Sequence, residues 1–352
     1  MQIMIKNYSK LTLGILLSGF LFSCSSTNLL TLSVTEPAPV YLPSQGKSVG
    51  IINRSLPNSK NEPFDVIDKI LSVEGKDLDK DGANESVLGL QNELTKNNGF
   101  AAVKLIEDAN LKNVGLGVFP AALQWENVEK IAQKNQVDYL FELSFYDTDT
   151  KVDYKTATVE KANVVGIKIP MIEHQVNIAT MIKNGWRIYD VKNREILDEI
   201  ASNNVINSSG RGINPVKAAE AVMGRKQNVL KISNRLGVDY ALKTLPYKIR
   251  VSRDYYVKGT PNFEIARRRA QTGNWDGAAE LWEKEVNNPD PTIAGRACYN
   301  MAIINEINGN LDTAVNWASK SYSDYGDKLA LRYLNILKDR IAKKEQLVAE
   351  NH

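Results

Sequence analysis

Cysteine and histidine are scarce in this sequence of 352 residues, which contains two of each: Cys24, Cys298, His174 and His352. A zinc site needs several such ligands close together, and a nucleophile triad needs a histidine beside the nucleophile. The sequence also has no His-Glu-x-x-His pair and no phosphate-binding loop. We therefore expect a protein that is not an enzyme and that uses no cofactor.

An excess of charge of either sign is also missing. The 44 lysines and arginines nearly balance the 41 aspartates and glutamates, which gives a formal net charge of +3. No stripe of basic residues marks a nucleic-acid surface, so we expect no nucleic-acid partner. If Cys24, which follows an amino-terminal apolar run, is modified, Cys298 has no other cysteine to pair with. We therefore expect no internal disulfide, and a packed core must stabilise the chain.

An apolar segment near the amino terminus is short. Lys6 and Lys10 precede the apolar residues 11–22, and a small serine stands just before Cys24. This order is typical of a secretory signal peptide, and the segment is shorter than the roughly 20 apolar residues that span a bilayer. We therefore predict a signal peptide over residues 1–23.

The end of this segment, Leu21-Phe-Ser-Cys24, resembles the lipobox of bacterial lipoproteins, with Phe22 where a smaller residue is usual. The resemblance implies that Cys24 becomes the first mature residue and carries acyl chains such as palmitate. Several chains on one residue anchor a protein stably, since each buried methylene contributes about 0.8 kcal/mol. The alternative is an ordinary signal peptide with an incidental cysteine.

The residues after the predicted lipidation site bear on the location of the protein. Ser25-Ser-Thr-Asn28 lacks the aspartate that retains lipoproteins at the inner membrane in the general Gram-negative sorting pattern. It also lacks the acidic tether that resembles a surface-export signal in Bacteroidota lipoproteins. We therefore expect a lipid-anchored protein of the outer membrane that faces the periplasm.

After an anchor and linker over residues 24–44, residues 45–250 are predicted to form an α/β (or α+β) domain with a mixed sheet. Short apolar runs bounded by turn residues predict strands, and apolar residues at helical spacing predict helices between them. The alternation of the two predicts a sheet covered by helices. The strand candidates are Ser48–Asn53, Phe100–Leu105, Gln136–Tyr146, Gln175–Ile182, Gly185–Asp190 and Glu195–Leu197. The helix candidates are Phe64–Leu71, Glu85–Lys96 and Trp125–Asn135.

Two quoted stretches carry a family resemblance within this domain. Val137-Asp-Tyr-Leu140, followed by a variable insertion and a strand pair over Arg187–Leu197, resembles the curli-secretion lipoprotein and the TolB amino-terminal domain. The likeness covers roughly residues 45–245, and Arg194 stands where those families have glycine. It implies an α/β domain of the same type.

The same resemblance raises a question about two insertions. Curli-secretion lipoproteins form a pore from two hairpins, and Lys151–Pro170 and Ala201–Arg211 occupy comparable positions. A strand that faces lipid needs an apolar side along about 9–11 residues, and both insertions are too polar for a good one. We favour polar loops or hairpins on the periplasmic side, with pore-forming hairpins as the alternative.

The stretch Asp77-Leu-Asp-Lys-Asp-Gly82 matches the first half of an EF-hand calcium loop, with carboxylates at alternate positions and then glycine. The second half does not match, because Leu88 stands where a glutamate should complete the coordination. An acidic connector that leads into a helix at Glu85 explains the same residues. If the loop binds calcium instead, the candidate ligands are Asp77, Asp79 and Asp81.

Residues 251–352 contain two copies of a helical-hairpin pattern. Gly273-Asn274 and Gly309-Asn310 recur close to the period of about 34 residues of the tetratricopeptide repeat. Small residues occupy matching positions in the flanking helices: Ala266 and Ala302 before the turn, Ala278 and Ala314 after it. The pattern predicts an all-α tetratricopeptide-like domain that ends in a capping helix over Leu329–Leu347.

Stacked repeats of this kind leave a concave face that binds extended peptides. Two arginines on that face can hold a carboxylate in a bidentate fork. The alternative is a solvated basic face formed by residues 267–269. The residues expected to line the groove are Phe263, Arg267, Arg296, Tyr299 and Asn300.

The lipobox, the junction Arg253-Asp-Tyr-Tyr256 and the Gly-Asn repeats together resemble tetratricopeptide-bearing lipoproteins of Bacteroidota, a resemblance that implies no activity. We expect a non-enzymatic protein-binding or assembly factor. The lipid on Cys24 would hold it to the outer membrane, and an unknown protein or peptide would be its partner. The alternative is a subunit of a curli-type secretion pore.

Overall fold

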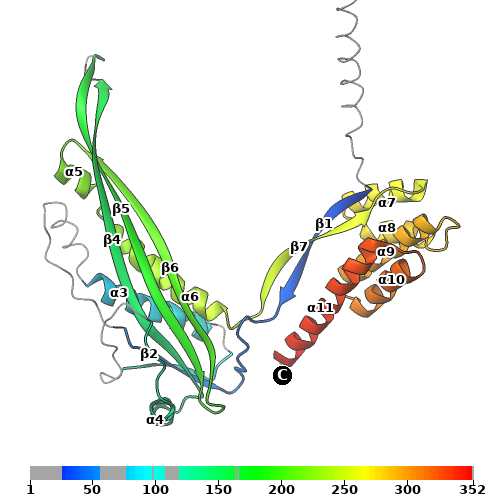
Figure 1. Cartoon of the computed structure of the whole chain (residues 1–352), viewed down its shortest axis with the longest axis horizontal. Coiled ribbons are helices and arrows are strands. Elements are labelled where there is room, and N and C mark those ends of the chain that lie inside the picture. The colour runs from blue at the N-terminus through cyan, green and yellow to red at the C-terminus, as the bar shows by residue number, and fades with distance from the viewer. Residues whose placement is uncertain are drawn as a thin grey trace, which may run out of the picture. The chain divides into compact units, whose positions relative to one another are not determined.

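A computed structural model describes residues 26–55, 77–96, 99–107, 119–162, 164 and 166–350 (Figure 1). The chain divides into two compact units. One unit is Ala38–Pro246, and the other combines Met1–Pro37 with Tyr247–His352. The predicted signal peptide, the predicted lipidation site Cys24 and the helix predicted over Phe64–Leu71 lie outside the described residues.

The unit Ala38–Pro246 is built on a five-stranded sheet in the order β3-β2-β4-β5-β6. The buried strand β2 (Ser48–Asn53) pairs in parallel with β3 (Ala102–Ile106) and with β4 (Tyr139–Ala162). The strand β5 (Lys168–Asp190) pairs antiparallel with β4 and with β6 (Glu195–Gly212). The sheet is therefore mixed, as the sequence predicts.

Helices cover both faces of this sheet. The helices α3 (Leu78–Lys96) and α6 (Arg225–Leu242) share a core with Val49 and Ile51 of β2. The helix α4 (Trp125–Asn135) shares a second core with Ile52. Because successive side chains of a strand point to opposite faces, the two cores lie on opposite faces of the sheet.

The helices α3 and α6 approach each other closely at two glycines. A Cβ on Gly237 would lie 1.8 Å from the carbonyl oxygen of Ser86, and one on Gly89 would lie 2.0 Å from that of Asn234. The hydroxyl of Ser86 also donates to the carbonyl of Ser233 at 3.0 Å. Any side chain at either glycine would force the two helix backbones apart.

The strands β4 and β5 are much longer than predicted. β4 has 24 residues, and it pairs with β2 through Tyr139–Leu143 alone. The rest of β4 continues with β5 as an extended hairpin (Figure 1). We call the paired segments Thr148–Ala162 and Lys168–Ile182 the arm. The insertion Lys151–Pro170, for which we expected a polar loop or hairpin, is thus part of a hairpin, because threonines and valines favour extended backbone even where the composition is polar.

The second insertion, Ala201–Arg211, is also part of a strand, since it lies within β6 and pairs with β5. A short helix, α5 (Pro215–Glu220), lies close against this strand, where a Cβ on Gly210 would meet the Ala218 carbonyl at 2.3 Å. The turn between β5 and β6 places Arg194 at a φ of 53°. Glycine adopts this left-handed conformation with less strain than arginine does.

The other unit pairs two strands with five helices among its described residues. β1 (Thr27–Glu36) pairs antiparallel with β7 (Tyr247–Tyr256) over its whole length. The prediction that residues 24–44 are an anchor and linker is therefore wrong for β1, whose alternate buried residues Leu30 and Val34 were not recognised as a strand. The helices are α7 (Pro261–Gln271), α8 (Trp275–Glu283), α9 (Pro291–Ile307), α10 (Leu311–Ser323) and α11 (Lys328–Glu350).

The turns between these helices follow the predicted pattern. Gly273 and Gly309 adopt φ angles of 81° and 79°, which L-residues rarely adopt, and each precedes an asparagine at the start of the next helix. Small residues pack the helices together: Ala266, Ala278, Ala302 and Ala314 are all fully buried. The prediction of a sheet domain followed by an all-helical region is confirmed at this level of description.

Candidate functional site

The five residues predicted to line a peptide groove lie on two helices of one core. Phe263 and Arg267 belong to α7, and Arg296, Tyr299 and Asn300 belong to α9. The side chains of Phe263, Tyr299 and Asn300 are buried, so they do not line an open surface. The expectation of an open groove at these positions is wrong, because Phe263 is part of the core and a strand of the same chain contacts Tyr299 and Asn300.

That strand is β7, and Asn300 binds its end. The side-chain amide of Asn300 donates to the carbonyl of Tyr256 and its oxygen accepts from the backbone N–H of Tyr256, each at 2.7 Å. The rings of Tyr256 and Tyr299 meet edge to face with centroids 5.3 Å apart. The asparagine therefore recognises an extended backbone, as expected for a peptide-binding helical face, but that backbone belongs to its own chain.

The two arginines of the predicted groove also differ from expectation. Arg296 donates to the carbonyl of Lys258 at 3.0 Å, and its guanidinium lies 5.1 Å from the ring centroid of Tyr256. Arg267 is half-buried on α7. The pair therefore forms neither an open fork for a carboxylate nor a fully solvated basic face.

A buried carboxylate, Glu306 on α9, connects β7 to the helices. Arg253 of β7 forms two hydrogen bonds with it at 2.9 Å, one to each carboxylate oxygen. Tyr333 and Arg340, both on α11, donate to the same carboxylate at 2.6 and 2.5 Å. We call these four residues the Glu306 cluster.

The electrostatics of the Glu306 cluster favour the ionised carboxylate. Burial by itself raises the pKa of Glu306, but hydrogen bonds from Arg253 and Tyr333 and the charge of Arg253 outweigh it, so the pKa lies below its usual value. Burial and the adjacent charge of Glu306 raise the pKa of the Tyr333 hydroxyl. One feature of the sequence could have indicated this cluster. Glu306 lies in an apolar helix, and a glutamate that is fully buried requires a partner for its charge.

A groove lies beside β1 in this unit. Its main part has a volume of about 760 Å³ and is lined by Asn28–Ser33 of β1, by Trp275 and Ile307, and by Glu306 and Arg340. A second hollow of about 280 Å³ shares Ser33, Gly309 and Arg340 with the first and continues along β1 to Glu36. Lys343 and Lys344 line that second part. We call the two hollows together the β1 groove, and no residue predicted as a site from the sequence lines it.

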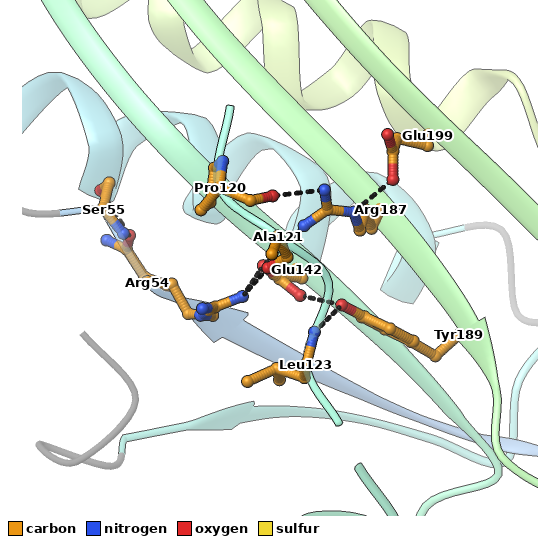
Figure 2. Close-up of polar contacts among 10 residues, drawn as sticks. Arg54, Ser55, Pro120, Ala121, Leu123, Glu142, Arg187, Tyr189 and Glu199 are labelled. Atoms are coloured by element: carbon orange, nitrogen blue, oxygen red, sulfur yellow. Dashed lines mark hydrogen bonds and ion pairs between the residues drawn. The ribbon is translucent and has the colours of Figure 1, made fainter. Parts of the chain in front are cut away.

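The other unit contains a second buried carboxylate, Glu142 of β4, which is fully buried (Figure 2). Arg54, just past β2, donates to it at 2.5 Å. The hydroxyl of Tyr189 on β5 also donates to it at 2.5 Å and accepts from the backbone N–H of Leu123 at 3.0 Å. Arg187 of β5 lies 3.6 Å from the same carboxylate.

Arg187 extends this network to the sheet surface. It donates to Glu199 of β6 at 2.5 Å and to the carbonyl of Pro120 (Figure 2). Its guanidinium also stacks over the ring of Phe119, 4.2 Å from the centroid. Every member contacts another strand or the 119–123 segment, so we interpret the Glu142 network as a structural joint that holds β2, β4, β5 and β6 together.

The candidate calcium ligands are directed to different partners. Asp79 lies in the first turn of α3, is buried, and accepts from the backbone N–H of Thr148 at 2.9 Å and from its hydroxyl at 2.5 Å. Asp81 pairs with Lys226 of α6 at 2.6 Å. The helix starts at Leu78, earlier than the predicted start at Glu85. Within the described ranges, no three acidic, histidine or cysteine side chains lie close enough together to hold a metal ion.

One serine in the sequence stands in a catalytic-type pattern that the local structure explains otherwise. Gly46-x-Ser48-x-Gly50 matches the letters of the hydrolase nucleophile elbow, which requires a turn after a strand and before a helix. Here Ser48 opens β2, and its backbone N–H donates to Asp138 at 2.8 Å. Gly50 instead allows the side chain of Ile106 to approach, so the match does not carry the elbow geometry.

The arm combines polar residues with exposed apolar ones. His174 forms a hydrogen bond with the hydroxyl of Tyr154, and the two rings stack with centroids 5.9 Å apart. The exposed apolar side chains of the arm are Val152, Tyr154, Ile169, Met171 and Ile172. Within the described residues, no helix combines the length and the apolar content needed to cross a membrane.

These features define a protein with two units. One is a mixed α/β unit, and the other is a helical unit with a two-stranded ribbon and a groove along the edge of strand β1. Residues 46–256, more than half of the chain, match the family described as Domain of unknown function (DUF8603), and the chain belongs to this family. Residues 264–339 match a second family, described as Domain of unknown function (DUF6340).

Two solved structures resemble the chain only distantly. The PelC dodecamer from Paraburkholderia phytofirmans is 11% identical, with a TM-score of 0.26 over 62% of this chain and 99% of that one. A neuraminyllactose-binding hemagglutinin homolog from Helicobacter pylori is 8% identical, with a TM-score of 0.29 over 58% of this chain and 94% of that one. Likenesses at this level establish neither a shared fold nor a shared function. No curated protein matches the chain.

Proposed function

We propose that this protein is a non-enzymatic, lipid-anchored binding or assembly factor at the periplasmic face of the outer membrane, and that it binds a protein partner. The observation that carries the proposal is the β1 groove, whose main part, of about 760 Å³, lies between a strand edge and four helices. The charged residues that line this main part, Glu306 and Arg340, are hydrogen-bonded to each other. The groove therefore offers groups for recognition rather than an activated acid, base or nucleophile.

We also propose that α7–α10 are two tetratricopeptide-type hairpins. The support is the pair of Gly-Asn turns at matching positions, the side chain of Asn274 that accepts from the Gly277 N–H at 2.9 Å, and the fully buried alanines that let the helices approach. Asn300 binding to the backbone of β7 is the kind of contact such helices make with extended peptides.

The membrane anchor is tested on Cys24. We expect metabolic labelling with a fatty-acid analogue to mark the wild-type protein and to miss Cys24→Ala, which should move from the membrane to the soluble fraction. Cys298→Ala is the matched control, because it removes the other cysteine, which is buried, and should keep the label. A wild-type protein that is unlabelled, or that is recovered from the cytosol, would contradict the proposal.

Partner binding is tested by site-specific crosslinking in the native membrane. A photo-crosslinking residue in place of Leu29, which lines the β1 groove and is 69% exposed, should capture one defined protein. The same residue in place of Arg268, which is exposed on α7 outside the groove, should not capture it. Equal capture at both positions, or none at Leu29, argues against binding at this groove.

The second candidate function is a subunit of a secretion pore, and the arm favours it. Val152 and Tyr154 of β4 are exposed and share one face of the hairpin, and Lys151 and Asp153 lie on the other. Such alternation is what a strand between lipid and water requires. A pore subunit should appear as a ring-shaped oligomer in detergent and release dye from vesicles, whereas a binding factor should do neither.

A further inference from the structure

Strand β1 has one edge without a strand partner within the described residues, since its two-stranded sheet contains β7 alone. The carbonyl of Ser26 accepts from the N–H of Val257 at 2.9 Å. Backbone groups in an antiparallel ladder alternate in direction, so those of Leu29, Thr31 and Ser33 point away from β7. Asn300 provides a check, because it binds the outward backbone groups of Tyr256, which pairs with Thr27.

The β1 groove borders this edge rather than one face of the ribbon. Successive side chains of a strand point to opposite faces, yet the groove contacts every residue from Asn28 to Ser33 and continues to Glu36. Strand β7 contributes Tyr255 alone. The outward N–H and C=O groups of Leu29, Thr31 and Ser33 therefore face an open hollow, and no described residue hydrogen-bonds to them on that side.

The charged residues that line the groove carry a positive excess: Arg340, Lys343 and Lys344 against Glu36 and Glu306. Arg340 contacts the carboxylate of Glu306. Lys343 pairs with Glu36 and Asp339, and Lys344 is exposed on the same helix beside it. The apolar side chains of Trp275 and Ile307 lie at the other end of the groove.

We propose that the β1 groove binds an extended, acidic peptide segment of a partner protein, which adds to β1 as a third strand. Its backbone pairs with Leu29, Thr31 and Ser33, and its carboxylates face Arg340 and Lys344. Main-chain bonds supply affinity in this mode and side-chain pockets supply selectivity. The inference rests on the proposed binding function and names the class of partner for that groove.

The test begins with a phage-displayed library of random ten-residue peptides selected against the full chain. Enriched peptides are expected to carry acidic residues and to lack internal proline. Amide exchange of the complex should slow at Leu29, Thr31 and Ser33, whose amides exchange fast in the free protein. Enrichment of lysine-rich peptides, failure to enrich any peptide, or protection elsewhere in the chain overturns the proposal.

Proline substitutions provide a matched pair of variants. Thr31→Pro removes an outward N–H without breaking the pairing with β7, since proline is tolerated where the N–H points away from the ladder, and it should weaken binding of the enriched peptide about tenfold through lost main-chain hydrogen bonds. Arg250→Pro makes the same change on the outward edge of β7, which does not line the groove, and should leave affinity unchanged. Lys344→Glu should weaken it about twofold to fivefold.

The outcomes separate this inference from the proposed function. If crosslinking through Leu29 captures a partner and Thr31→Pro leaves that capture intact, strand addition fails while partner binding stands. If neither a partner nor a peptide binds, both fail. A concentration-dependent dimer that Thr31→Pro abolishes would identify a second copy as the occupant and overturn the peptide proposal.

Discussion

At the residue scale, Glu306 shows why a buried charge needs all its partners. It is fully enclosed and accepts from Arg253, Tyr333 and Arg340, so its removal leaves two guanidinium groups without their carboxylate. Breaking a buried ion pair from one side costs about 3–5 kcal/mol. We expect Glu306→Gln to lower the free energy of unfolding by about 3 kcal/mol in urea denaturation, and the exposed control Glu345→Gln to change it by less than about 0.5 kcal/mol.

The same residue sets a pH dependence. The pKa of Glu306 lies below its unfolded value of about 4.3, so its contribution is fully present above that value and is lost as the pH falls through the lower folded pKa. The difference in unfolding free energy between wild type and Glu306→Gln should therefore be constant above about pH 5 and shrink in more acidic solution. A difference that is unchanged at acidic pH would show that the ionised carboxylate is not what stabilises this cluster.

The sequence predicted the types of some site residues but not their partners. Asn300 and Tyr299 were selected as peptide-binding residues, and Asn300 does bind an extended backbone. That the backbone is β7 depends on β1 and β7 pairing across the length of the chain, which no local pattern shows. Glu306 and Glu142 escaped notice for the same reason, since a single carboxylate in an apolar segment does not indicate which distant arginine pairs with it.

At the element scale, the local sequence pattern predicted those strands and helices whose position depends on the spacing of their own apolar residues. The strands β2 and β3 and the helix α4 lie where apolar runs and helical spacing place them. The start of α3 was not predicted, because aspartate and glycine among the first residues, Asp79 to Gly82, have low helix propensity. The hydrogen bonds of Asp79 with Thr148 of β4 offset this low propensity. The length of the two strands in the arm was not predicted, because their polar residues resemble a loop in composition.

The contact between α3 and α6 gives a prediction at this scale. Gly237→Ala would place a methyl group against the backbone carbonyl of Ser86, at 1.8 Å before any adjustment. The helices must separate, and overpacking of this kind costs about 1–3 kcal/mol. We expect denaturation to show a loss of about 2 kcal/mol, whereas Lys231→Ala, an exposed position on α6, should change stability by less than about 0.5 kcal/mol.

At the scale of the whole molecule, two cores without a shared residue predict two unfolding events. The core of Met1–Pro37 with Tyr247–His352 contains Phe263, Trp282 and Leu337, and the main core of Ala38–Pro246 contains Phe141 and Trp186. A cooperative transition belongs to a unit that buries its own core. Because β1 pairs with β7, one unit is built from both ends of the chain and the other from the segment between them. The predicted arrangement, in which one domain follows the other along the chain, did not include this.

Calorimetry with the two variants tests this division. Glu306→Gln should lower the melting temperature of one transition alone, by at least about 12 °C, because it removes about 3 kcal/mol and a loss of 1 kcal/mol shifts a unit of about 100 residues by roughly 4–8 °C. Gly237→Ala should lower only the melting temperature of the unit Ala38–Pro246, by about 5 °C. Larger units shift by roughly 2–4 °C for each 1 kcal/mol lost. If either variant moves both transitions together, the units unfold as one, and the effects of groove variants on binding would then have to be corrected for the stability of the entire chain.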